Sequence, residues 1–501
     1  MNESEFKTIL LGQFPHSPTP GQSRLISKIS GFCTLKEGAA GKENATVFVL
    51  KGYAGTGKTT LIGALINCLP AINQKSVLLA PTGRAAKVLS NYSGKPAYTI
   101  HKKIYKRMIN ADGIGRFVLQ PNLHTHTLFI VDEASMISAG GGLSGSFSDQ
   151  SSLLDDLVRY VSAGSNCKLI LIGDTAQLPP VGLSISPALD TDHLKHAYSF
   201  TLDSIELTDV VRQQAESGIL VNATQIRELI AQLNSPENAH VNSQRNAQGG
   251  IQTPRLTTAY FKDIVRLSGN DLEDALNTSY SNFGVEGTAV ICRSNKRANQ
   301  YNQQIRARIR WQESEISAGD YMMVVKNNYH WLPDDSVAGF IANGDIVEVL
   351  SVGSAKELYG FRFADAKIRM VDYPSAPPLE VKLILDTIAA ETPSLTSEQN
   401  KKLYEEVLKD YSDVPDRRKR QTGLKKDPYY NALQVKFAYA ITCHKAQGGQ
   451  WETVFVDQGY LTKEMMNIEF LRWLYTAITR ASKKLYLVNF NKEFFGEEEF
   501  I

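Results

Sequence analysis

The segment Gly52-Tyr53-Ala54-Gly55-Thr56-Gly57-Lys58-Thr59 fits the pattern G-x-x-x-x-G-K-[ST] at every position. An apolar, β-branched run over 46–50 precedes it, and a stretch with helical spacing begins at Thr60. In this strand–loop–helix context, backbone N–H groups and the helix N-terminus face an anion, Lys58 reaches the β- and γ-phosphates, and Thr59 offers a hydroxyl to Mg²⁺. The pattern predicts a phosphate-binding loop for ATP, with contacts from Gly52, Ala54, Gly55, Thr56, Gly57, Lys58, Thr59 and Thr60.

Composition indicates a globular protein of several domains. The chain has 501 residues, of which 43% are hydrophobic and 21% charged, and its net charge is only +2. This length suits about three or four domains. The near-neutral charge excludes a protein whose whole surface binds polyanions, so any nucleic-acid site must be a local groove. The 5 cysteines are scattered without a CxxC pair, which predicts neither a disulfide framework nor a zinc site.

The chain has no apolar run long enough for a transmembrane helix, so no membrane partner is expected. The polar, acidic N-terminus at 1–5 is unlike a signal peptide. We therefore expect a cytoplasmic protein.

Two sets of β-rich runs divide the chain. The first set alternates with helical stretches, as a parallel sheet requires. A second set follows a polar stretch at 233–250 that is typical of a loop, and material at 316–430 interrupts this second set. The predicted strands are 46–50, 76–80, 127–131 and 168–172 in the first set, and 288–292, 435–440, 453–456 and 484–488 in the second.

Acidic residues follow the predicted strand that ends at Val131. An apolar strand followed by Asp-Glu is a Walker B arrangement, in which Asp132 holds Mg²⁺ partly through water and Glu133 orients and deprotonates the attacking water. After the next strand, the amide of Gln177 is suited to a hydrogen bond with the γ-phosphate. The alternative for Asp132 and Glu133 is a pair of solvated acids at a strand end. The alternative for Gln177 is a plain proline-rich turn.

A further strand–helix junction lies at 81–87, where small residues, a hydroxyl and two cations come together. These residue types suit contacts with a phosphate backbone. An ordinary glycine turn with solvated charges is the alternative.

The order of these motifs resembles the superfamily 1 helicases and, within them, the RecD/Dda-like branch of superfamily 1B. The resemblance covers roughly residues 20–482. In the first half it rests on PTPGQ (18–22), GYAGTGKTT (52–60), LLAPTGRAAKVLS (78–90), TIHK (99–102), IVDEAS (130–135) and GDTAQLPPVG (173–182). In the second half it rests on ELTDVVRQ (206–213), CRSNK (292–296) with Asn302, GDYMM (319–323), NGD (343–345), AYAITCHKAQG (438–448) and LYTAITRA (474–481).

The resemblance implies an α/β fold with two tandem RecA-like P-loop NTPase domains, each a parallel sheet with flanking helices. It further implies a small β-hairpin, or pin, inserted in the first domain, and an SH3-like β-barrel with a helical segment inserted in the second. We expect domain 1A over 1–204 with the pin subdomain 1B at 102–126, domain 2A over 205–315 and 431–501, and the inserted subdomain 2B over 316–430.

The resemblance also assigns roles to individual residues. Gln22 would read the adenine edge, while Arg212 and Arg480 would reach the γ-phosphate from the second domain as arginine fingers. ATP would then close the cleft between the domains, and its hydrolysis would reopen it. The implied catalytic set is Lys58, Glu133, Gln177, Arg212 and Arg480. The implied DNA contacts are Pro81, Thr82, Gly83, Arg84 and His101 on the first domain, and Thr442, His444 and Lys445 on the second.

Some of these assignments leave alternatives open. A structural hydrogen bond is the alternative role for His101 and His444. Asp112-Gly113, between β-capable flanks, predicts the hairpin of the pin, with Phe117 as its stacking tip or else as a core or merely exposed residue. The charged helical stretch at 396–428 is either a solvated helix face or a contact with the phosphates of duplex or displaced strand.

The resemblance implies a monomeric, Mg²⁺- and ATP-dependent 5′–3′ DNA helicase that translocates on single-stranded DNA and acts at junctions with duplex. Single-strand-binding or replication proteins are further expected partners. A translocase that displaces proteins without strong unwinding is the alternative enzyme. A regulatory subunit of a recombination-repair complex, with ATP as a clamp, is the non-catalytic alternative. A P-loop kinase would not explain the second domain.

Overall fold

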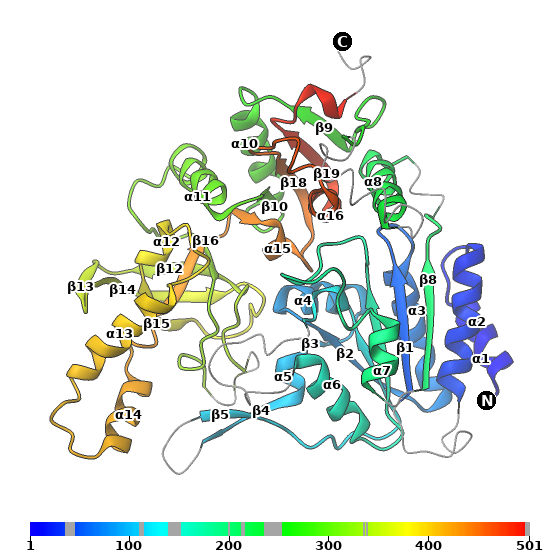
Figure 1. Ribbon diagram of the computed structural model, residues 1–501, viewed down its shortest axis with the longest axis horizontal. Coiled ribbons are helices and arrows are strands. Elements are labelled where there is room, and N and C mark those ends of the chain that lie inside the picture. The colour runs from blue at the N-terminus through cyan, green and yellow to red at the C-terminus, as the bar shows by residue number, and fades with distance from the viewer. Residues whose placement is uncertain are drawn as a thin grey trace.

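The computed structural model describes residues 1–35, 46–109, 115–138, 152–198, 201–211, 216–234, 253–333, 336 and 339–495, although not the side chains of 107–109 and 115–117. It contains two parallel sheets, a barrel and a separate hairpin (Figure 1). Nearly all of the predicted polar loop at 233–250 lies outside the described residues. Within the described ranges, no helix combines the length and the apolar character needed to cross a membrane.

The first parallel sheet has the strand order β3-β2-β6-β7-β1-β8. All four runs predicted for this sheet are confirmed as strands, and β3 and β8 extend the sheet at its two edges. The strands are β1 (Thr46–Gly52), β2 (Lys75–Ala80), β3 (Ala97–Thr99), β6 (Thr127–Val131), β7 (Lys168–Gly173) and β8 (Thr201–Leu207).

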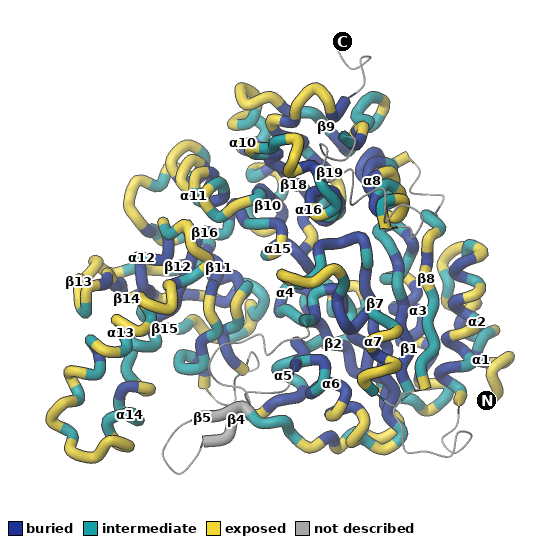
Figure 2. The backbone as a smooth tube through the Cα atoms, viewed as in Figure 1, coloured by how far each residue is buried: buried dark blue, intermediate teal, exposed yellow. Residues whose placement is uncertain are grey.

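Helices cover both faces of this sheet because its central strands are apolar on both sides. In β1, Phe48 and Leu50 pack in one core, while Val47 and Val49 pack in the other. Figure 2 shows these strands as largely buried. The first core includes α1 (Glu3–Gly12), α2 (Pro20–Thr34), α3 (Lys58–Cys68), η1 (Leu69–Ile72) and α4 (Gly83–Ser93). The second includes η2 (Ala134–Met136), α5 (Ile100–Ile104), α6 (Leu153–Ser162) and α7 (Thr191–Ala197).

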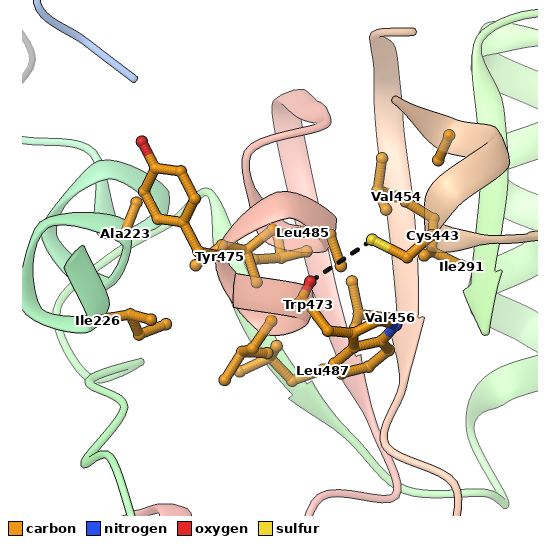
Figure 3. Close-up of a cluster of buried hydrophobic side chains, with 14 of the residues drawn as sticks. Ala223, Ile226, Ile291, Cys443, Val454, Val456, Trp473, Tyr475, Leu485 and Leu487 are labelled. Atoms are coloured by element: carbon orange, nitrogen blue, oxygen red, sulfur yellow. Dashed lines mark hydrogen bonds between the residues drawn. The ribbon is translucent and has the colours of Figure 1, made fainter. Parts of the chain in front are cut away.

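The second parallel sheet has the order β17-β10-β18-β19-β9. Figure 3 shows one of its cores, where strand residues such as Ile291 and Val456 face Trp473, whose carbonyl accepts a hydrogen bond from the Cys443 thiol. The strands are β9 (Ile264–Leu267), β10 (Thr288–Cys292), β17 (Ala440–Thr442), β18 (Trp451–Asp457) and β19 (Ala481–Val488). The helices are α8 (Gly218–Asn234), α10 (Leu272–Phe283), α11 (Asn295–Gln304), η5 (Ile305–Ile309), α15 (Cys443–Ala446), α16 (Ile468–Ile478) and η6 (Lys492–Phe494). The predicted pair of parallel sheets with flanking helices is thus confirmed.

A closed five-stranded barrel interrupts the second sheet, as predicted. It closes because β12 pairs with both β11 and β14. Its strands are β11 (Tyr321–Val324), β12 (Ile346–Val352), β14 (Phe361–Met370), β15 (Leu379–Ile384) and β16 (Leu433–Phe437), and β13 (Lys356–Leu358) pairs with β14 outside the closed ring.

The prediction of a single strand over 435–440 was wrong. β16 pairs with β11 and β15 in the barrel, whereas β17 pairs with β10 in the second parallel sheet. The chain changes sheets between Phe437 and Ala440, where Tyr439 is fully buried. Because both ends and the connection are apolar, the sequence pattern does not mark the change. The barrel therefore continues past residue 430, the predicted end of the insertion.

A helical segment lies between β15 and β16, as predicted. It consists of α12 (Asp386–Ala389), α13 (Ser397–Lys409) and α14 (Arg417–Lys426). Figure 1 shows α13 and α14 extending from the barrel away from both parallel sheets. The predicted pin hairpin is also present, as the antiparallel pair β4 (Tyr105–Ile109) and β5 (Gly115–Leu119). Its connection at 110–114 lies outside the described residues.

A buried ion pair joins the barrel to the second domain. Arg306 donates from Nε and Nη2 to the carboxylate of Asp320 at 2.9 and 2.8 Å, and Tyr439 donates to the same carboxylate at 2.9 Å. Asp320 is fully buried. A buried charge that loses its partner is costly, so this network is expected to hold the base of the barrel in place.

We expect Asp320→Ala to lower the free energy of unfolding by about 3–5 kcal/mol, because the substitution leaves Arg306 buried without a counter-charge. Chemical denaturation followed by circular dichroism measures the change. Asp365→Ala is the control, since Asp365 is an exposed partner of Lys382 and its loss should cost no more than about 1 kcal/mol. Equal stabilities of the two variants would contradict the structural role of Asp320.

Candidate active site between the two domains

The phosphate-binding loop connects β1 to α3, and α3 begins at Lys58. Gly55 and Gly57 have φ angles of +77° and +83°, in the left-handed region that favours glycine. The Lys58 ammonium donates hydrogen bonds to the carbonyls of Gly52 at 2.5 Å and Tyr53 at 2.8 Å. The loop therefore places the lysine directly over its own backbone, where the phosphates are expected.

Gln22 lies beside this loop. Its side chain is buried, its Nε2 donates to the carbonyl of Thr56 at 3.0 Å, and its Oε1 accepts from the N–H of Thr19 at 2.9 Å. With Thr19 it forms the capping box of α2. Gln22 thus connects the start of α2 to the loop, and its contact with adenine stays a prediction.

The two predicted Walker B acids follow β6. Glu133 has a left-handed φ of 53°, and its N–H donates to the Asp132 carboxylate at 2.9 Å. Burial and the neighbouring Glu133 raise the pKa of Asp132 to about 6, whereas the charges of Lys58 and Arg480 lower it. A buried carboxylate beside another carboxylate is stabilised by a cation. The hydroxyl of Thr59 and the Asp132 carboxylate are the hard oxygen ligands that fit Mg²⁺.

Arg480 brings a positive charge to this site from the second domain. Its guanidinium is buried at the end of α16, and Nη1 lies 3.8 Å from Oε1 of Glu133. It also donates to the carbonyls of Thr476 and Gly449. Sequence reasoning placed Arg480 at the ATP site, and the structure does bring it to the predicted catalytic acid. The second predicted finger, Arg212, lies outside the described residues.

Gln177 is buried where the loop after β7 meets the second domain. Its Oε1 has no hydrogen-bond partner among the described residues. The next residue, Leu178, donates to Thr476 Oγ1 at 2.9 Å and accepts from Gln447 Nε2 at 2.7 Å. A free amide oxygen at a domain boundary can accept a hydrogen bond from water while its nitrogen donates to a phosphate, so the predicted role of Gln177 fits its position.

Tyr475 and Asp174 complete the site, and sequence reasoning missed both. The Tyr475 hydroxyl on α16 accepts from the N–H of Ala54 at 2.8 Å and donates to the Asp174 carboxylate at 2.6 Å. Burial raises the pKa of Asp174, and the charge of Lys58 opposes this shift. One hydroxyl of the second domain thus contacts both the phosphate-binding loop and the end of β7. Both residues lie in recognised motifs, but only the fold shows that they meet.

The predicted DNA contacts at 81–84 lie at the start of α4. Thr82 is its N-cap and accepts from the N–H of Ala85 at 3.2 Å. A side chain at Gly448, whose φ is +72°, would come within 2.7 Å of Ala85. The first strand–helix junction therefore lies against the motif at 438–448 of the second domain. Pro81 and Gly83 share this junction, and Gly83 also lies against Asp345 of the barrel.

Arg84 does not project freely into a groove. Its guanidinium stacks on the Trp451 ring at 4.0 Å, and burial lowers its pKa. The side chain thus forms an interdomain contact in this structure, and its predicted contact with DNA stays a prediction. Lys87, the other cation, pairs with Asp372 at 3.2 Å. Trp451 gave no sequence signal, because a lone tryptophan in a strand looks like core.

His101 packs between the first domain and the barrel, edge-on to Phe340 at 6.4 Å between ring centroids. Burial lowers its pKa to about 4, so its ring is neutral at neutral pH and brings no positive charge to a phosphate. On the second domain, Thr442 is the N-cap of α15 and His444 is exposed. Burial and the nearby Lys436 lower the pKa of Lys445 to about 8, so it is largely charged at neutral pH.

Phe117 is not at the tip of the hairpin. The strand register pairs it with Arg107, in the middle of β5. Because Phe117 is paired within the strand, the prediction of Phe117 as the tip residue was wrong in position. Its side chain lies outside the described part of the chain.

Two protein-family models match this chain. The model described as an AAA domain matches residues 38–253, which contain the loop, the Walker B acids and Gln177. The model described as a UvrD-like helicase C-terminal domain matches residues 437–488, which contain α15 and α16. The two matched regions therefore include the residues that meet at the interdomain site.

Known relatives match parts of the chain. The ATP-dependent RecD2 DNA helicase of Deinococcus radiodurans is 32% identical over 34% of this chain and 20% of its own length. The ATP-dependent DNA helicase Dda of Enterobacteria phage T4 is 31% identical over 37% of this chain and 39% of its own. The chain thus spans well under half of either relative. A crystal structure of a Bacteroides Pif1 helicase with ADP-AlF3 and single-stranded DNA covers 96% of this chain and 95% of its own, with 15% identity and a TM-score of 0.43.

We expect Tyr475→Phe to lower kcat for ATP about tenfold or more, because a hydrogen bond to a charged group contributes about 1.5–3 kcal/mol. The variant keeps the ring but removes the contact with Ala54 and Asp174. Steady-state ATPase assays measure the effect. Tyr486→Phe is the matched control, since no hydrogen bond of its hydroxyl occurs in the described structure and its ring stacks on Phe455. Unchanged turnover in Tyr475→Phe would show that the interdomain hydroxyl is dispensable.

Proposed function

We propose that this chain, which belongs to the RecD/Dda-like branch of the superfamily 1B helicases, is an ATP-dependent helicase that translocates 5′ to 3′ on single-stranded DNA and separates duplex ahead of it. The proposed partners are single-stranded DNA and its junctions with duplex. The sequence relatives RecD2 and Dda are named as DNA helicases, which supports DNA as the nucleic acid.

The observation that carries this proposal is the approach of Arg480 to Glu133 at 3.8 Å across the two domains. A kinase or a simple ATPase needs its acid, lysine and metal ligand in one domain only. A site completed by a buried cation from a second domain makes hydrolysis depend on how the domains are placed. Such dependence is what a motor requires, because it converts turnover into relative motion.

Each residue of the site has its own proposed role in ATP hydrolysis. Lys58 leaves its backbone carbonyls to contact the β- and γ-phosphates, and Glu133 accepts a proton from the attacking water. Arg480 stabilises the negative charge that develops on the γ-phosphate. Mg²⁺, held by Thr59 and Asp132 when bound, would supply further positive charge there. Loss of the γ-phosphate removes the anion that attracts Arg480, so the cleft is free to open.

Strand movement requires a grip on each domain. Thr82 on the first domain and Thr442, His444 and Lys445 on the second are the proposed grips. Since Gly448 lies against Ala85, the two grips are adjacent at the domain boundary. A change in the cleft would therefore alter their spacing along one strand. Separation of duplex would occur at the β4–β5 hairpin.

The proposal is tested by unwinding of duplexes that carry either a 5′ or a 3′ single-stranded tail. We expect unwinding of the 5′-tailed duplex only, and we expect Lys58→Ala to abolish it. The variant should lose ATP turnover by at least about 100-fold, because it removes a charge from the transition state, while DNA binding survives. Unwinding of the 3′-tailed substrate alone would reject the polarity. DNA-stimulated ATPase without any unwinding would favour the protein-displacing translocase.

A further inference from the structure

The helix α14 carries an unusual concentration of positive charge. Its sequence is RRKRQTGLKK, and it has no acidic residue. Four consecutive cations, 417–420, occupy its first turn, where the helix dipole is already positive. Like charges three or four positions apart, such as Arg417 and Arg420, lie side by side on a helix, and like charges so placed destabilise it. In isolation, this helix is thus electrostatically unfavourable.

The rest of the segment fixes the helix in one orientation. The Asp416 carboxylate caps it by accepting from the N–H groups of Arg418 and Lys419. Leu424 is buried in the small core between the barrel and α13. Gly423 lies so close to Tyr411 that an added Cβ would come within 2.6 Å of its ring. The face opposite Leu424 must therefore point outward.

Four cations share this outward face. At 100° per residue, the spacing of an α-helix places Arg418, Lys419, Lys425 and Lys426 within about one third of the circumference, centred away from Leu424. All four are exposed, in the part of Figure 2 that extends from the barrel. We call these four residues the α14 cationic face.

The lysines of this face differ from those of the neighbouring helix. On α13, Lys401 pairs with Glu405 and Lys409 pairs with Glu406. Lys419, Lys425 and Lys426 form no ion pair with any residue that the structure describes. The Asp416 carboxylate is occupied by the helix cap. The charges of these three lysines are therefore not compensated by ion pairs within the described chain, unlike those of Lys401 and Lys409 on α13.

We propose that the α14 cationic face binds the phosphate backbone of duplex DNA. Lys419 and Lys426 are about 10 Å apart along the helix axis, a distance that spans about three phosphates of one strand. Lysines and arginines on such a face contact phosphates without reading sequence. Binding also removes the repulsion among the cations, which the free helix must bear.

The occupant is duplex, and not the translocating single strand, because of where α14 lies. It belongs to the insertion that extends from the barrel, away from both parallel sheets (Figure 1). The proposed single-strand grips lie instead at the boundary between the two sheets. This assignment rests on the proposed helicase function, because a helicase works where duplex DNA adjoins the single strand on which it moves.

The test uses the full chain with Lys419→Gln, Lys425→Gln and Lys426→Gln combined. Fluorescence anisotropy measures Kd for a blunt duplex without tails over a range of salt concentrations. Each phosphate contact contributes about 0.9 to the slope of log Kd against log salt. We expect the slope of the triple variant to fall by about 2–3, with weaker binding at low salt. An unchanged slope overturns the proposal.

The matched control combines Lys401→Gln, Lys402→Gln and Lys409→Gln on α13, which changes the net charge by the same amount. We expect the slope of log Kd against log salt for this control to match that of the wild type. An equal fall in both variants would show that the slope depends on net charge alone, and it would overturn the proposal. The proposal would also be overturned if the α14 triple variant kept its binding to duplex but lost binding to a polyglutamate peptide. That result would favour an acidic protein as the partner of the α14 cationic face.

Oligo-dT-stimulated ATPase separates this proposal from the proposed function. We expect the wild type and both triple variants to be stimulated equally, because α14 lies outside the ATP site. Failure of stimulation in the wild type would reject the helicase function, while the slope on blunt duplex would still decide whether α14 binds DNA.

Discussion

The Tyr475 hydroxyl is the contact on which the arrangement of the two domains depends. It is fully buried, and it accepts from the Ala54 N–H of the first domain while donating to Asp174 of the same domain. The same helix, α16, places Thr476 under Leu178 and Arg480 beside Glu133. In a buried, low-dielectric site these bonds are strong when made and costly when lost. One helix of the second domain, with the residues that directly follow it, thus contacts the phosphate-binding loop, the Walker B acids and the loop after β7.

In the proposed mechanism, this arrangement couples a chemical event at the phosphates to the movement of a nucleic-acid strand. The α16 helix packs in the same core as α15, where the Cys443 thiol donates to the Trp473 carbonyl. From α15 the chain leads directly to Gly448, which lies against α4 of the first domain. A shift of α16 would therefore change the positions of the residues in both proposed grips. Close-packed interiors transmit such shifts because they have few voids to absorb them.

Much of this organisation is readable from the sequence, for physical reasons. The four central strands of the first sheet, β2, β6, β7 and β1, are apolar runs, so they and the loop after β1 were predictable, whereas the edge strands β3 and β8 have no such run. The change of sheet between Phe437 and Ala440 was not, since an apolar residue suits either sheet. The Tyr475–Asp174 bond and the stacking of Arg84 on Trp451 join residues hundreds of positions apart, and each partner alone has a local explanation. Pattern reasoning finds chemistry that lies within one motif more readily than contacts between motifs.

We propose that ATP turnover depends on nucleic acid, because the site is complete only when both domains are in place. The most direct measurement is the ATPase rate of the wild-type chain with and without oligo-dT at saturating Mg²⁺-ATP. A strand that aligns the two grips should also align Arg480 with Glu133, so we expect a large rise in kcat on addition of oligo-dT. The same kcat with and without the oligonucleotide would contradict it.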